Sequence, residues 1–212
     1  TTSNNWISAR LIHALGPEQL VKKERMFGIT GYMEPTLPLC LGTNDVTVRE
    51  MVGAYSAFAN KGVRTQPVLV TKITDASGQT LWANTPHRVE VTNEDAYRKM
   101  VQMLCNVVKA GTGRGLSSFG ISAQTGGKTG TTNTNSDTWF IAFTPQIVVG
   151  VWVGGEERYI HFNTMTLGQG AKSALPMYGK FMQKVYGDPS LGYSQSAVFD
   201  VPVDSYYGGG GH

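Results

Sequence analysis

A lysine and two threonines stand among glycines in the stretch T-G-G-K-T-G-T, residues 125–131. The ammonium of Lys128 can hold an anion in a cleft, and hydroxyls can donate hydrogen bonds to the same anion. Thr129 and Thr131 are two residues apart, so on a strand their side chains share one face. Gly130 between them has no side chain, which lets a ligand lie close against the strand. The pattern therefore predicts a site for a negatively charged group.

A nucleotide phosphate loop is the first alternative for this stretch. Such a loop has the form G-x-x-x-x-G-K-[ST], and its first glycine lets backbone N–H groups point at the phosphates. With Gly127-Lys128-Thr129 as its end, that glycine would stand at position 122, where the chain has Ser122. A phosphate loop also leads into a helix, whereas this stretch leads into the extended segment DTWFIAFTP. Both differences argue against a nucleotide site.

A second alternative is acyl transfer by an active-site serine enzyme. Penicillin-binding proteins and serine β-lactamases carry three boxes, S-x-x-K, S-x-N and K-T-G. Lys128-Thr129-Gly130 matches the third box, and Ser3-Asn4-Asn5 matches the second in the required order. Ser3 also has a plainer interpretation, as the N-cap of a helix that begins near Asn5.

Longer segments make the likeness more specific. The run GGKTGTTNTNSDTWFIAFTPQIVVGVWVG resembles the K-T-G strand and the next two strands of the transpeptidase domain of class A (bifunctional) penicillin-binding proteins. The segments KAGTGRG and LCLGTNDVTVREMVGAYSAFANKG resemble other parts of that domain, and the likeness extends from about Ser3 to Gly155. It implies the penicillin-binding-protein/serine β-lactamase-like transpeptidase fold.

The resemblance also implies an activity, peptidoglycan D,D-transpeptidation through an acyl-serine intermediate. The partners implied are peptidoglycan stem peptides and β-lactams, and the location implied is extracytoplasmic, at the periplasmic face of the cytoplasmic membrane. In the roles implied, Lys128, Thr129 and Thr131 hold the ligand carboxylate, and the N–H of Thr131 forms half of an oxyanion hole. Ser3 would relay protons, and Asn5 would bind the substrate amide and the lysine of the first box.

The first box, which would supply the nucleophile, is missing from the chain. No serine is followed by a lysine three residues later, and the resemblance places S-x-x-K before Thr1. We therefore expect residues 1–190 to be the C-terminal portion of a transpeptidase domain, inactive alone, with a glycosyltransferase domain further upstream. Residues 191–212 would form a C-terminal extension with a flexible glycine-rich end. Unpaired strand edges invite association, so a homo-oligomer is a further hypothesis.

Two other functions remain open at this stage. A D,D-carboxypeptidase or serine β-lactamase-type hydrolase uses the same boxes and passes the acyl group to water. A noncatalytic binding module would use the Lys128 cleft to hold peptidoglycan peptides reversibly.

The elements that must position these boxes can be read from periodicity and from stop signals. Helices are expected at about 5–15, 17–28, 47–60, 92–111 and 171–186. A hairpin is expected from VLVTKITD and QTLWA, and three extended segments follow AGTGRG. The first helix should carry Ile7, Leu11, Ile12 and Leu15 on one side. Helices before and after a small antiparallel sheet indicate an α+β fold.

Composition excludes several classes of function. The 212 residues include 41% hydrophobic residues, enough for a core, and the net charge of +3 gives no basic surplus for nucleic acid. No apolar run reaches the length of a membrane helix. His and Cys lack metal-ligand spacing, so we expect no metal and no cofactor. Cys105 falls on an apolar helix face, which predicts a buried thiol.

Overall fold

A three-stranded antiparallel sheet forms the centre of the computed structural model, which describes residues 2–203. Its strands are β5 (Gly126–Thr131), β6 (Asp137–Phe143) and β7 (Val148–Gly154), in the order β5-β6-β7. Their β-branched and aromatic residues favour extended structure, and the three predicted segments are confirmed. Within the described residues β5 and β7 are the two edges of this sheet.

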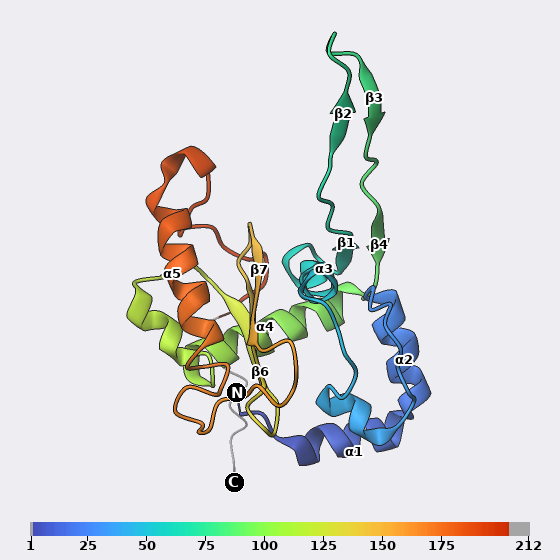
Figure 1. The fold of residues 1–212 in the computed structure, drawn as a ribbon, viewed down its shortest axis with the longest axis vertical. Coiled ribbons are helices and arrows are strands. Elements are labelled where there is room, and N and C mark those ends of the chain that lie inside the picture. Colours follow the sequence, from blue (N-terminus) through green and yellow to red (C-terminus); the bar gives the residue numbers. More distant parts are fainter. Residues whose placement is uncertain (1, 204–212) are drawn as a thin grey trace.

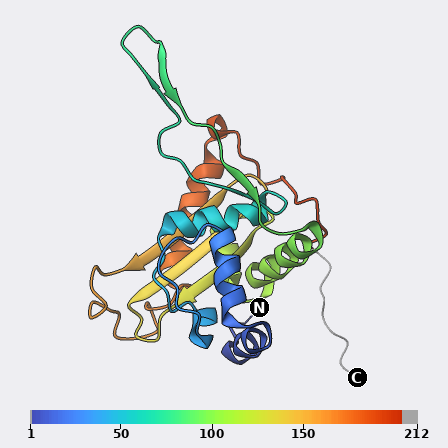
Figure 2. The ribbon, with the colours of Figure 1, turned by 90° about the vertical axis from the view of Figure 1, so that its right-hand side faces the viewer.

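Helices cover both faces of the sheet (Figures 1 and 2). On one face α3 (Val48–Ala59) crosses β6 and β7. A Cβ on Gly150 would lie 2.8 Å from Val52 Cγ2, so the glycine allows this close approach. On the other face α5 (Ala174–Gly187) buries Tyr178 edge-on against Phe140, with 5.1 Å between the ring centroids. The α+β fold expected from the sequence is confirmed.

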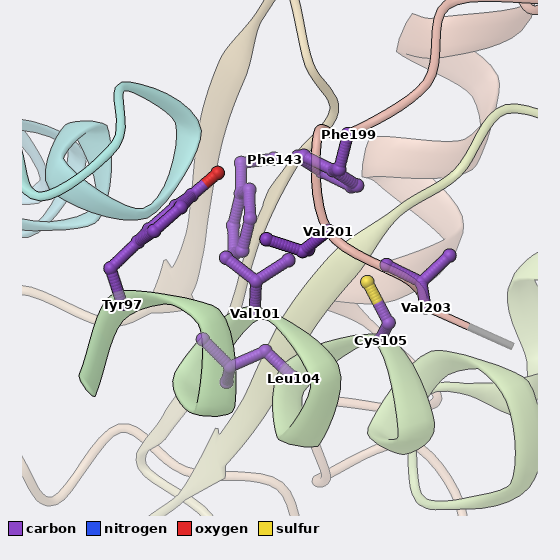
Figure 3. Close-up of a cluster of buried hydrophobic side chains, with 8 residues drawn as sticks. All are labelled: Tyr97, Val101, Leu104, Cys105, Phe143, Phe199, Val201 and Val203. Atoms are coloured by element: carbon purple, nitrogen blue, oxygen red, sulfur yellow. The ribbon is translucent and has the colours of Figure 1, made fainter. Parts of the chain in front are cut away.

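A second core lies between the sheet and α4 (Glu94–Ala110), shown in Figure 3. Its buried residues come from α4, β6 and the segment after α5: Tyr97, Val101, Leu104, Cys105, Phe143, Phe199, Val201 and Val203. The burial predicted for Cys105 is confirmed. The described part of the expected C-terminal extension thus packs against the body, and its glycine-rich end lies in residues 204–212, outside the described residues.

A long hairpin projects from the body (Figure 1). Its outer half pairs β2 (Lys72–Thr74) with β3 (Thr80–Ala83), as predicted. The pairing of β1 (Val63–Thr65) with β4 (Arg88–Glu90) at its base was not predicted. The side chain of Asp75 accepts the N–H groups of Ser77 and Gln79 and so shapes the turn.

The N-terminal part of the chain forms a pair of helices, α1 (Asn5–Leu15) and α2 (Pro17–Met26), and Gly16 with a φ of 85° separates them. The bounds of α1 match the prediction, and most of its apolar side is exposed. Only Ile12 is buried, whereas Ile7, Leu11 and Leu15 are exposed, because the described chain covers α1 on one side only. Short 3₁₀ helices lie at Leu37–Leu41 (η1), Arg114–Phe119 (η2) and Pro189–Leu191 (η3). In residues 2–203 no helix combines the length and the apolar character needed to cross a membrane.

Candidate active site

Ser3 and Lys128, which are far apart in the sequence, meet in the structure. The Lys128 ammonium donates to Ser3 Oγ at 2.6 Å and to the backbone oxygen of Thr129 at 2.7 Å. Ser3 lies just before α1 and Lys128 lies in the edge strand β5. The tertiary structure therefore brings two of the predicted boxes together at one place.

Asn4, not Ser3, caps α1. Its side-chain oxygen accepts the N–H groups of Trp6 at 3.0 Å and Ile7 at 3.3 Å, which satisfies donors that a helix start leaves unpaired. The plainer interpretation of Ser3 as the helix cap is therefore wrong, and its hydroxyl is left to meet Lys128. Asn5 is the first residue of α1 and is exposed; within residues 2–203 its side chain makes no hydrogen bond with Ser3 or Lys128.

Burial changes the acid–base character of Lys128. The side chain is half-buried, and this burial lowers the pKa of its ammonium below the ordinary value, because desolvation disfavours a charged form. A lysine with a lowered pKa gives up its proton more readily. Its contact with the Ser3 hydroxyl is thus suited to both anion binding and proton transfer.

The two threonines lie on the opposite face of β5 from Lys128, as strand alternation requires. The hydroxyl oxygens of Thr129 and Thr112 lie 2.8 Å apart. The hydroxyl of Thr131 accepts the N–H of Gly170 at 3.1 Å. The shared face of Thr129 and Thr131 was predicted from their spacing, but these two partners were not.

Thr112 and Gly170 come from loops on either side of β5 in the sequence. Thr112 lies in the glycine-rich segment AGTGRG, which stands out in the sequence. Nothing in that segment predicted that Thr112 would contact Thr129. No sequence signal pointed to Gly170. A Cβ on Gly170 would lie 2.7 Å from the backbone oxygen of Gly130, so only a glycine lets this loop lie so close to β5.

The turn between β5 and β6 is held by side-chain hydrogen bonds. Asp137 accepts the Trp152 indole N–H at 2.9 Å and the Ser136 hydroxyl at 2.8 Å. Its own N–H bonds Thr132 Oγ1 at 3.0 Å. These contacts fix the end of β5 next to Thr131. Within the described residues, no group of three or more His, Cys, Asp or Glu is placed to hold a metal ion.

Comparison with protein families decides the assignment. Residues 1–162 match the family model described as the penicillin binding protein transpeptidase domain. The chain belongs to this family. Penicillin-binding protein 1A of Aquifex aeolicus is 35% identical over 183 residues, which cover 86% of this chain and 24% of that protein. Penicillin-binding protein 2D of Bacillus subtilis is 29% identical, over 99% of this chain and 31% of that protein.

Solved structures of the family share the fold. The crystal structure of penicillin-binding protein 1A from Haemophilus influenzae superposes with a TM-score of 0.78 at 22% identity, over 88% of this chain and 33% of that one. PonA1 from Mycobacterium tuberculosis, solved in complex with penicillin V, gives a TM-score of 0.72 at 19% identity, over 91% of this chain and 55% of that one. By length, the chain spans about a quarter to a third of the Aquifex aeolicus and Bacillus subtilis relatives. The matched region is the transpeptidase domain, and the relatives named above are penicillin-binding proteins.

Proposed function

We propose that the chain forms one side of the active site of a peptidoglycan D,D-transpeptidase, a serine-type acyltransferase of the extracytoplasmic space. The observation that carries this proposal is the 2.6 Å contact between Lys128 Nζ and Ser3 Oγ. It joins a cation that can hold a carboxylate to a hydroxyl that can pass on a proton, on one edge of the sheet. Both are needed in acyl transfer from a peptide that ends in a carboxylate.

The remaining roles are part of the same proposal. Thr129 and Thr131 would donate to the terminal carboxylate of a D-Ala-D-Ala peptide or the carboxylate of a β-lactam, and Lys128, on the other face of β5, would supply the positive charge that attracts it. Gly130 would leave room for the peptide along β5, and the N–H of Thr131 would contribute to the oxyanion hole. Asn5, exposed at the start of α1, would meet the substrate amide and the lysine of the first box.

The nucleophile must come from an S-x-x-K segment that these 212 residues do not contain. Its serine oxygen would bond to the carbonyl carbon of the penultimate D-Ala while the C–N bond to the terminal D-Ala breaks. Ser3 would pass the serine's proton to the leaving amine. An acceptor amine would then attack the acyl-serine, lose a proton through the same route and free the serine. The 212 residues alone would therefore be inactive.

A labelling experiment with fluorescent penicillin tests the proposal. We expect the longer polypeptide, with an S-x-x-K segment before Thr1, to become covalently labelled. Lys128→Ala should label much more weakly, Lys72→Ala on the exposed hairpin should label normally, and residues 1–212 alone should remain unlabelled.

The same experiment separates the alternatives. Absence of label on the longer polypeptide would contradict an acyl-serine enzyme, and reversible peptide binding without an adduct would then favour the binding module. If label forms, analysis of the products from a stem peptide plus an amine acceptor distinguishes a transpeptidase from a hydrolase: cross-linked peptide supports our proposal, and released D-Ala with free acid alone contradicts it.

A further inference from the structure

Thr129 has a partner that no sequence box includes. Its hydroxyl oxygen lies 2.8 Å from that of Thr112, and either oxygen can be the donor. Thr112 is half-buried in the loop between α4 and η2. The contact therefore joins the strand that carries Lys128 to the end of a long core helix.

Backbone hydrogen bonds fix the residues on both sides of Thr112. The N–H groups of Gly111 and Gly113 both bond the backbone oxygen of Val107, each at 3.0 Å. A Cβ on Gly113 would lie 3.2 Å from Val108 Cα, so this loop lies tightly against α4. Thr112 is thus held from both sides, and its hydroxyl has a defined place relative to β5.

Because each threonine hydroxyl has a single hydrogen, a bound carboxylate would set the direction of the Thr112–Thr129 hydrogen bond. A threonine hydroxyl has one hydrogen and can accept at its lone pairs, whereas a carboxylate only accepts. If Thr129 donates its single hydrogen to a carboxylate, the 2.8 Å contact with Thr112 persists only with Thr112 as the donor. The order is then Thr112 to Thr129 to carboxylate, in which each bond polarises the next.

Thr131, on the same face of β5, also has a hydroxyl whose hydrogen is available for a ligand. It accepts the N–H of Gly170, which cannot act as an acceptor, so its hydroxyl hydrogen stays available for a ligand. With a carboxylate bound, each of the two strand hydroxyls would therefore accept one hydrogen bond from the protein. Thr129 would accept it from the Thr112 side chain, and Thr131 accepts it from the Gly170 backbone.

We propose that Thr112 is a positioning residue, whose hydroxyl donates to Thr129 and so turns the Thr129 hydrogen toward a bound carboxylate. This inference rests on the proposed function, because it concerns carboxylate recognition at that site. Thr112 itself touches no substrate in this arrangement and acts only through Thr129.

The test measures acylation rates of the longer polypeptide by intact mass, with benzylpenicillin and with benzylpenicillin methyl ester, which lacks the carboxylate charge. Thr112→Val removes the donor at nearly constant shape, Thr112→Ser keeps it, and Thr80→Val removes a hydroxyl from the exposed strand β3 as a matched control. We expect Thr112→Val to slow acylation by benzylpenicillin roughly fivefold, the effect of one hydrogen bond. The methyl ester should be slowed less than about twofold, and Thr112→Ser and Thr80→Val should match the wild type.

The outcomes separate the two proposals. A wild type that benzylpenicillin does not acylate would overturn the proposed function and this inference with it. A wild type that is acylated, with Thr112→Val slowing both ligands equally or neither, would overturn the role of Thr112 alone. A Thr112→Ser variant as slow as Thr112→Val would do the same, since serine keeps the donor.

Discussion

The ammonium of Lys128 in β5 lies 2.6 Å from the hydroxyl oxygen of Ser3, just before α1. This contact connects two structural units, the sheet and the N-terminal helix pair. Asn4 caps α1 in place of Ser3, so the serine is free for chemistry. The relationship leads to predictions about both residues and about the elements that hold them.

Replacing Ser3 should impair proton transfer while leaving the fold intact. In the longer polypeptide, Ser3→Ala should lower the acylation rate by about a hundredfold, the low end of general acid–base contributions. Stopped-flow measurement with a fluorescent penicillin gives this rate. Ser8→Ala, within α1, is the matched control and should acylate at the wild-type rate; equal rates for both variants would remove Ser3 from the proton pathway.

Loss of the Asn4 cap should loosen the start of α1. Asn4→Ala removes the acceptor for the N–H groups of Trp6 and Ile7, at a cost of about 1 kcal/mol. Because most of the apolar side of α1 is exposed, we expect local fraying, seen as faster hydrogen exchange of these two amides. Asn4→Asp should retain the slow exchange, since aspartate also caps. Unchanged exchange in Asn4→Ala would show that other contacts hold the helix end.

A side chain at position 170 should push its loop off the sheet. Gly170→Ala places a Cβ 2.7 Å from the backbone oxygen of Gly130, and overpacking of this kind costs about 1–3 kcal/mol. Urea denaturation should show the loss as a lower midpoint. Gly187→Ala is the matched control at the end of α5, because no atom lies within 4 Å of its new Cβ. Equal midpoints for the two variants would contradict the close approach.

Glu50 should make the stability of the fold depend on pH. Partial burial works to raise its pKa, but hydrogen bonds from Thr30 and Thr47 outweigh it and lower the pKa of Glu50 from 4.5 to about 2. The folded state thus favours the carboxylate, and its contribution is complete above about pH 4.5 and is lost as the pH falls toward about 2.

Urea denaturation at several pH values tests this prediction. Glu50→Gln should unfold more easily than the wild type at neutral pH, and the difference should shrink as the pH falls below 4.5. Glu34→Gln, at an exposed loop position, should keep the wild-type profile. A constant difference across this pH range would show that the carboxylate of Glu50 carries no special stability.

Most elements of the fold were predictable because their signals are local. The Thr47–Glu50 capping box begins α3 as expected, with both reciprocal hydrogen bonds present. Alternation placed Thr129 and Thr131 on one face of β5. The exposure of the apolar side of α1 was not predictable in this way. Periodicity shows which side chains share one side of a helix, but not whether another element packs against that side.

The sequence by itself determined the chemical identity of the site: the K-T-G and S-x-N boxes, their order, and the absence of S-x-x-K from these 212 residues. Only the tertiary structure decided that Lys128 meets Ser3, that Thr112 contacts Thr129 and that Gly170 donates to Thr131. The physical reason is separation along the chain. Helix caps and strand alternation arise between near neighbours, whereas these contacts join residues from different elements and leave no periodic trace in the sequence.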